Sequence, residues 1–186
     1  MARFTFTPLA PAGLIRVERQ RLDDERGFFS RFFCAEEFRE VGFDRPIAQI
    51  NHTLTRRKSA VRGLHFQHPP HTEIKLVSCL RGSVFDVAVD LRRDSPTFLS
   101  WHGEVLCAAD GHGLLIPRGF AHGFQALDAD SELVYLHSDP FVADAEGAVS
   151  VFDPRIGIEW PLPVSDLSAR DRAHPPIGPE FAGLSP

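Results

Sequence analysis

Two apolar blocks of the sequence carry side chains that could perform proton chemistry. The first is Arg62-Gly63-Leu64-His65-Phe66-Gln67, with Lys75 ten positions after the histidine, and the second is the block 116–124, which contains His122. Removing a proton next to a carbonyl requires a base that works near neutral pH and a cation that holds the enolate oxygen. Histidine is the side chain whose unperturbed pKa lies nearest to neutrality. His65 and Lys75 are therefore a candidate base and enolate-binding pair.

A lone histidine in a strand pattern can instead be a hydrogen-bonded core residue. Lys75 argues for a pocket, because it lies in the next expected strand and lysine is rarely buried without a partner or a purpose. Gln49 and Asn51 share one face of their expected strand and could line the same cavity. Strand alternation puts Arg62 on the face of Leu64, away from His65, unless a bulge intervenes.

A metal site is the competing interpretation of these histidines. Pro117-x-Gly119-x-x-His122 is similar to the second half-motif of metal-binding cupins, and His65, His68 and His71 follow at three-residue spacing. Positions 65 and 68 of a strand point to opposite faces, and Gln67 stands where metal cupins complete a His-x-His pair. Ligand geometry therefore favours a site without metal. A metal-dependent oxygenase that uses His65, His122 and a third ligand is kept as the alternative.

Short apolar stretches that recur about every 8 to 12 residues indicate the elements that must position these side chains. In the clearest one, Val84–Leu91, Phe85, Val87, Val89 and Leu91 share one face, and Asp86 and Asp90 share the other. The other expected strands cover residues 14–18, 28–33, 47–54, 60–67, 74–80, 104–108, 113–116 and 132–137. Helices are expected at 35–41 and near 165–172, and turns at Arg81-Gly82 and Asp110-Gly111. Many strands and little helix predict an all-β jelly roll or a related barrel.

The composition narrows the class of protein. The 186 residues fit a single domain, 1–186, with a Pro- and Gly-rich tail at about 175–186 that is expected to be peripheral or to fray. A net charge of -5 argues against a general nucleic-acid binder, and no apolar run is long enough to span a membrane. Three widely spaced cysteines do not predict a disulfide framework or a zinc site. A reducing cytoplasm is the expected compartment.

The blocks together resemble one family along nearly the whole chain. The matching segments are 24–29, Gln49-x-Asn51, 62–67, 75–77, 84–92, 95–98, 116–124 and 156–161. They resemble the dTDP-4-dehydrorhamnose 3,5-epimerases, which act on sugar nucleotides. The resemblance implies a cupin-type jelly roll (a double-stranded β-helix) with one or two short helices, no metal and no other cofactor. It also implies a homodimer in which the aromatic strand near 28–33 crosses to the partner.

The resemblance also assigns roles to residues. His65 falls on the family's catalytic base, Asp171 on its carboxylate partner, Lys75 on the enolate-holding cation and Tyr135 on the acid at the opposite face of the sugar. Substrate-binding positions are implied for Arg26, Phe29, Arg31, Gln49, Asn51, Arg62, His122 and Phe141, with Arg26 and Arg62 on the diphosphate. The expected reaction is epimerisation of a nucleotide-linked 4-keto-6-deoxyhexose at carbon 3, carbon 5 or both. A third interpretation is a non-catalytic cupin, but it leaves the set His65, Lys75, Tyr135 and Asp171 without a purpose.

Two departures from the family pattern concern the nucleotide. Arg31 stands where the family usually carries a Glu, and Pro140-Phe141 replaces its paired aromatics. The resemblance implies that both regions help to hold the thymine. A carboxylate would accept the thymine ring N–H, whereas an arginine can only donate. The sequence therefore leaves the carrier open between dTDP, CDP and GDP.

Overall fold

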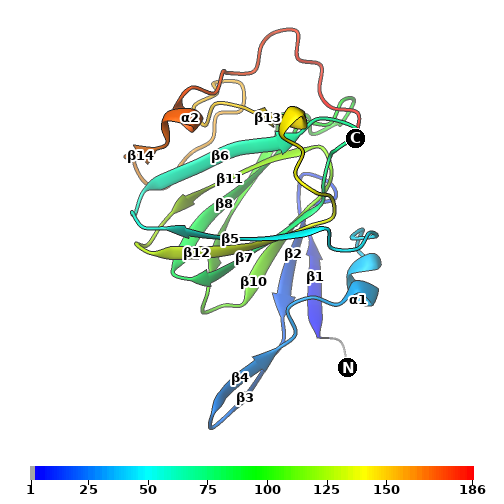
Figure 1. The fold of residues 1–186 in the computed structure, drawn as a ribbon, viewed down its shortest axis with the longest axis vertical. Coiled ribbons are helices and arrows are strands. Elements are labelled where there is room, and N and C mark those ends of the chain that lie inside the picture. The colour runs from blue at the N-terminus through cyan, green and yellow to red at the C-terminus, as the bar shows by residue number, and fades with distance from the viewer. Residues whose placement is uncertain (1–2) are drawn as a thin grey trace.

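Two antiparallel β-sheets lie face to face in the computed structural model, which describes residues 3–186 (Figure 1). The first sheet has the strand order β1-β2-β10-β7-β12-β5, and the second has β13-β6-β11-β8-β9, with β14 pairing parallel to β6. The first sheet contains β1 (Phe4–Pro8), β2 (Ile15–Arg19), β10 (His112–Ile116), β7 (Lys75–Arg81), β12 (Ser131–His137) and β5 (Gln49–Thr55). The second contains β13 (Glu146–Ala148), β6 (Ala60–Gln67), β11 (Phe120–Ala126), β8 (Ser83–Asp90), β9 (Trp101–Cys107) and β14 (Asp166–Leu167).

The remaining elements are short. Strands β3 (Arg21–Asp24) and β4 (Gly27–Ser30) form a hairpin that projects away from the sheets as an arm (Figure 1). Helix α1 (Ala35–Arg39) buries Phe38, η1 (Ala143–Ala145) is a single 3-10 turn, and α2 (Ala169–Arg172) lies near the carboxyl end. None of the helices within residues 3–186 has the length and hydropathy needed to cross a membrane.

Apolar side chains fill three layers. The layer between the sheets includes Val77, Ala88, Phe124 and Tyr135. The outer face of the second sheet is covered by loops from the carboxyl-terminal part of the chain, and the outer face of the first by the region of α1. Both faces of each sheet are thus largely covered, which explains why β11 is buried at every position and shows no alternation. Strand β11 was for this reason not recognised as a strand from the sequence.

The predicted all-β class with two short helices is confirmed, and most expected strands agree within two or three residues. The strand expected at 28–33 was too long, because β4 ends at Ser30 and residues 32–34 pack towards α1. Strands β1 and β3 were not expected. The second helix begins only at Ala169, since residues 166–167 pair with β6 as β14. The three cysteines are free thiols.

The tail is better anchored than its composition suggests. Ile177 and Leu184 are buried in the layer on the second sheet, and Leu184 forms a β-bridge with Arg92. Proline and glycine restrict or loosen the backbone, but two well-placed apolar side chains suffice to fasten such a segment. The tail therefore helps to close the outer face of the sheet that carries His65.

Candidate active site

A cavity of about 250 Å³ opens between the two sheets where β5, β6, β7, β11 and β12 meet. Strand pairing brings the candidate side chains together, since His122 is directly opposite His65, His137 is opposite both Lys75 and Gln49, and Tyr135 is opposite Asn51. The lining polar and aromatic residues are Gln49, Asn51, Thr53, Arg62, His65, Gln67, Glu73, Lys75, His122, Tyr135, His137, Phe141 and Glu146, among others. Eight of the twelve residues assigned from the sequence line this one cavity.

Arg62 reaches the cavity beside His65 because the strand is irregular. The register of β6 against β11 shifts between His122 and Phe124, so that two residues of β6 face one of β11. Gly63 occupies the shift at φ 126°, and a Cβ there would lie 2.6 Å from Cα of Gly123. Only glycine fits this close approach. The bulge left open from the sequence is therefore present, and it turns Arg62 towards the face of His65.

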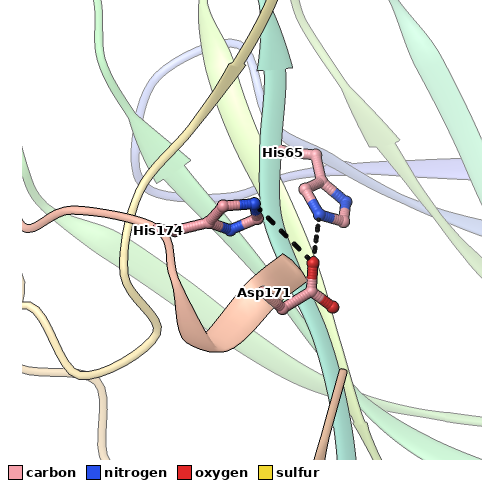
Figure 2. Close-up of side chains that lie close together, drawn as sticks. All are labelled: His65, Asp171 and His174. Atoms are coloured by element: carbon pink, nitrogen blue, oxygen red, sulfur yellow. Dashed lines mark hydrogen bonds and ion pairs between the residues drawn. The ribbon is translucent and has the colours of Figure 1, made fainter. Parts of the chain in front are cut away.

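His65 is held by Asp171, which lies just outside the cavity lining. Nε2 of His65 lies 2.8 Å from Oδ1 of Asp171, and the carboxylate is almost completely buried (Figure 2). Asp171 sits in α2, where Ser168 caps the helix by accepting the Asp171 backbone N–H. With Nε2 donating to Asp171, Nδ1 is the nitrogen that can take a proton from a ligand. The carboxylate thus orients the imidazole, as in hydrolase triads.

The surroundings of His65 favour its neutral form. Burial lowers the pKa of His65, Asp171 acts in the opposite direction, and the net direction is downward. His65 keeps one third of its side chain exposed to the cavity. A partly accessible, neutral imidazole with a fixed tautomer can act as a base at neutral pH.

Lys75 is buried beside a carboxylate. Its Nζ lies 2.9 Å from Oε1 of Glu73, and the other oxygen of Glu73 lies 2.9 Å from Nδ1 of His137. All three side chains are about nine-tenths buried. A buried ammonium needs such a counter-charge. Lysine has three N–H donors, so donation to Glu73 leaves capacity for an oxygen of a ligand.

Tyr135 presents a neutral phenol to the same cavity. It is 8 % exposed, and its hydroxyl lies 3.4 Å from Oγ1 of Thr53. Burial raises the pKa of Tyr135 well above its ordinary value, so the hydroxyl keeps its proton. His122 packs edge-on against the Tyr135 ring, and its own Nε2 is 2.7 Å from the buried Asp86. Tyr135 can therefore donate a proton, whereas His122 is held in place by Asp86.

The arrangement of histidines differs from the metal site considered above. Among residues 3–186, the group whose ligand atoms lie within 4.8 Å of one another is His65, Asp171 and His174. His174 lies edge-on to His65, 3.9 Å from the Asp171 oxygen (Figure 2). His122 is not in this group, and His68 and His71 are not among the residues that line the cavity. The alternative metal set of His65, His122 and a third residue is thus not assembled within the described residues.

Comparisons with known proteins place this chain in a family. The family model described as dTDP-4-dehydrorhamnose 3,5-epimerase matches residues 8–178. The chain belongs to this family. The enzyme of that name from Salmonella typhimurium is 42% identical over 161 residues, which cover 86% of this chain and 87% of the relative. The Legionella pneumophila epimerase, solved in complex with dTDP-4-keto-L-rhamnose, superposes with a TM-score of 0.91 at 36% identity and covers 98% and 99% of the two chains.

The family also contains enzymes of narrower action. A 3'-monoepimerase from Streptomyces bikiniensis, solved with dTDP-quinovose, matches with a TM-score of 0.85 at 34% identity, covering 91% of this chain and 86% of its own. The predicted family, cupin-like β fold and class of enzyme are confirmed. This chain is a sugar-nucleotide epimerase.

Besides Asp171, three residues assigned to the epimerase site lie outside its own cavity. Arg26, Phe29 and Arg31 belong to the arm or directly follow it. Arg26 pairs with Asp24 at 2.6 Å, Phe29 is 63 % exposed, and Arg31 pairs with Glu37 at 3.1 Å. Within residues 3–186, therefore, these side chains do not join the site of their own chain.

Glu73 and His137 of the epimerase were missed from the sequence. Each lies two residues from an assigned side chain, Glu73 before Lys75 and His137 after Tyr135. Since strand residues two apart share a face, extending the period from Tyr135 would have placed His137 at the cavity. Glu73 precedes β7, which begins at Lys75, so strand alternation does not extend to it. Arg56 and Arg57 are exposed in the connection between β5 and β6.

Proposed function

We propose that this epimerase inverts carbon 3, carbon 5 or both of a dTDP-linked 4-keto-6-deoxyhexose, through an enolate. The observation that carries the proposal is the single cavity lined by an oriented imidazole, a buried ammonium and a buried neutral phenol, contributed by His65, Lys75 and Tyr135. Three such groups are what proton removal, enolate binding and proton return require. Solved relatives with dTDP or dTDP-sugars bound support the carrier.

Each step uses a group in this cavity. Nδ1 of His65 takes the proton from a carbon next to the ketone, and the C–H electron pair moves to the ketone oxygen as it becomes an enolate. Lys75 donates a hydrogen bond to that oxygen, and Asp171 stabilises the imidazolium. Tyr135 then returns a proton to the opposite face of the carbon. The phenolate regains a proton from solvent, and the His65 imidazolium releases its proton to solvent. Each well-placed acid or base contributes about 10²–10⁴-fold.

The experiment that tests this function is incubation with dTDP-4-keto-6-deoxyglucose in heavy water, with deuterium counted at each carbon. Deuterium with inverted configuration at carbons 3 and 5 identifies a 3,5-epimerase, and deuterium with inversion at one of them identifies a mono-epimerase. Loss of exchange after treatment with a metal chelator would show that the exchange depends on a metal. Absence of exchange at both carbons would contradict the proposal.

The arm supports a homodimer with shared sites. Phe28 and Phe29 are more than half exposed on a hairpin that stands away from the sheets (Figure 1), and exposed aromatic side chains mark contact surfaces. The family resemblance implies a diphosphate-binding role for Arg26 on the same hairpin, but Arg26 lies outside its own cavity. We propose that the arm of each subunit completes the cavity of its partner around a two-fold axis.

A mixed dimer tests this exchange. We expect Arg26→Ala and His65→Ala each to be inactive as a homodimer, because each damages both sites. After co-expression with two affinity tags, the mixed dimer should regain one intact site of two, which gives about half of the wild-type activity per dimer. The measurement is the turnover of the doubly purified species. An inactive mixed dimer, or a monomer that retains full activity, would show that the arm does not serve a partner.

The nucleotide preference is tested at Arg31. If Arg31 donates to the base in the partner's site, Arg31→Glu should shift binding towards dTDP, because a carboxylate accepts the thymine N–H. One polar contact is worth about 1–3 kcal/mol, or roughly 5- to 150-fold in affinity. The measurement compares the Kd of dTDP, CDP and GDP for both proteins, with Arg39→Glu as the charge-matched control. Three unchanged preferences would mean that Arg31 only pairs with Glu37.

A further inference from the structure

Glu73 bridges the cation of the site to a histidine to which no role has yet been given. Its two carboxylate oxygens contact Lys75 and His137 separately, each at 2.9 Å. We infer that Glu73 and His137 are positioning residues, which fix the Lys75 ammonium where the enolate oxygen forms. The inference rests on the proposed role of Lys75 in the epimerisation.

The Glu73 carboxyl is ionised although it is buried. Burial raises the pKa of this carboxyl, but the His137 hydrogen bond and the Lys75 charge outweigh it, and the net direction is downward. Glu73 is therefore an anion that compensates Lys75. Removing one partner of a buried charge pair leaves the other uncompensated, which is strongly unfavourable. The ammonium and the carboxylate hold each other in one place.

The hydrogen bonds around His137 have a consistent direction. The Asn51 side-chain amide nitrogen lies 3.4 Å from Nε2 of His137, so Nε2 is the acceptor and Nδ1 carries the proton donated to Glu73. Asn51 in turn accepts from the side-chain amide of Gln49, whose oxygen accepts the backbone N–H of Phe141. Each of these four contacts thus pairs one donor with one acceptor. Glu73 is the final acceptor of this chain of hydrogen bonds, and Nδ1 of His137 points at it.

The chain links two parts of the cavity. Phe141 and Gln49 lie at one end of it and Lys75 at the other, and His137 also stacks on the Tyr135 ring with centroids 6.1 Å apart. A lysine side chain has four flexible methylene groups, so the position of its ammonium group varies unless another group fixes it. Misplacement of a catalytic group by about 1 Å can cost about 10²-fold in rate. Glu73 and His137 supply this precision to Lys75.

Three variants test the inference. Glu73→Gln keeps the shape but removes the charge, and we expect kcat to fall about 10- to 100-fold with KM changed less than about threefold. His137→Phe keeps the stacking on Tyr135 but loses the donor to Glu73, and its kcat should also fall. His137→Gln restores a donor to Glu73 and an acceptor for Asn51, and it should recover most of the loss. Glu104→Gln is the matched control, because Glu104 is also buried and paired with a histidine but lies outside the cavity.

The readouts are kcat, KM and the rate of deuterium exchange, alongside thermal unfolding of each variant. A loss of kcat in His137→Phe that His137→Gln reverses, at similar thermal stability, supports positioning. Equal activity of the Phe and Gln variants, or an unchanged or higher kcat in Glu73→Gln, overturns it. If Glu73→Gln does not fold, the two His137 variants still decide. Failure of the proposed function would appear separately, as a wild-type protein that exchanges no deuterium.

Discussion

The exchange of deuterium at the carbons flanking the ketone is expected to fall by about 10²–10⁴-fold when His65 is replaced by alanine. The variant should keep its fold, since the side chain is partly exposed and borders the cavity. His65 is the imidazole that the buried Asp171 orients, and Nδ1 is the nitrogen available for the carbon-bound proton. The measurement is exchange in heavy water with the 4-keto sugar nucleotide as substrate.

Two comparisons make this result specific. His102→Ala removes a histidine that also pairs with a carboxylate, but at the edge strand β9, and it should leave exchange unchanged. Asp171→Asn should lose nearly as much as His65→Ala, because an orienting group and its base act as a unit. Near wild-type exchange in His65→Ala would exclude it as the base.

The acid limb of the pH profile provides a further check on the same pair. Because the pKa of His65 is lowered, the base stays neutral at a lower pH than an exposed imidazole would. Activity should therefore persist at pH values below the ordinary pKa of histidine. Asp171 works against that direction by favouring the imidazolium. In Asp171→Asn the remaining activity should therefore decline at a still lower pH than in the wild type.

Tyr135→Phe is expected to separate proton removal from proton return. The phenol is the proposed acid for the face opposite His65, and burial keeps it protonated. Without it, net inversion should fall by about 10²–10⁴-fold. His65 can still remove a proton, exchange it with solvent and return it to the same face. Washout of label should then exceed inversion in the variant, measured on one sample by mass and by product configuration.

A matched variant separates the phenol from its surroundings. Thr53→Val removes the side-chain oxygen 3.4 Å from the Tyr135 hydroxyl but leaves the acid itself in place. Its ratio of washout to inversion should stay near that of the wild type. If washout and inversion decline in equal proportion in Tyr135→Phe, then Tyr135 is not the acid for the opposite face.

Most of the strands and many residues of the site could be predicted from local sequence patterns. Alternation along Val84–Leu91 and the apolar blocks around His65 and Lys75 predicted strands, because a residue's face in a strand depends only on its near neighbours. The family, the fold and the class of enzyme could also be recognised, since several motifs agree along the whole chain. Where both faces of a strand are covered, as in β11, alternation disappears and the local signal fails.

The tertiary structure alone decided how distant groups combine. Asp171 lies 106 positions from His65, and Glu73 lies 64 positions from His137, so no periodicity connects them. The turn of Arg62 into the cavity depends on a bulge whose position is set by the pairing of β6 with β11. The arm carries Arg26 and Phe29 away from their own cavity, because within residues 3–186 its two strands pair with each other and with no other strand. The sequence shows which residue types are present, and their spacing shows which face of a strand each one takes. Contacts between distant residues depend instead on strand register and on packing across the fold.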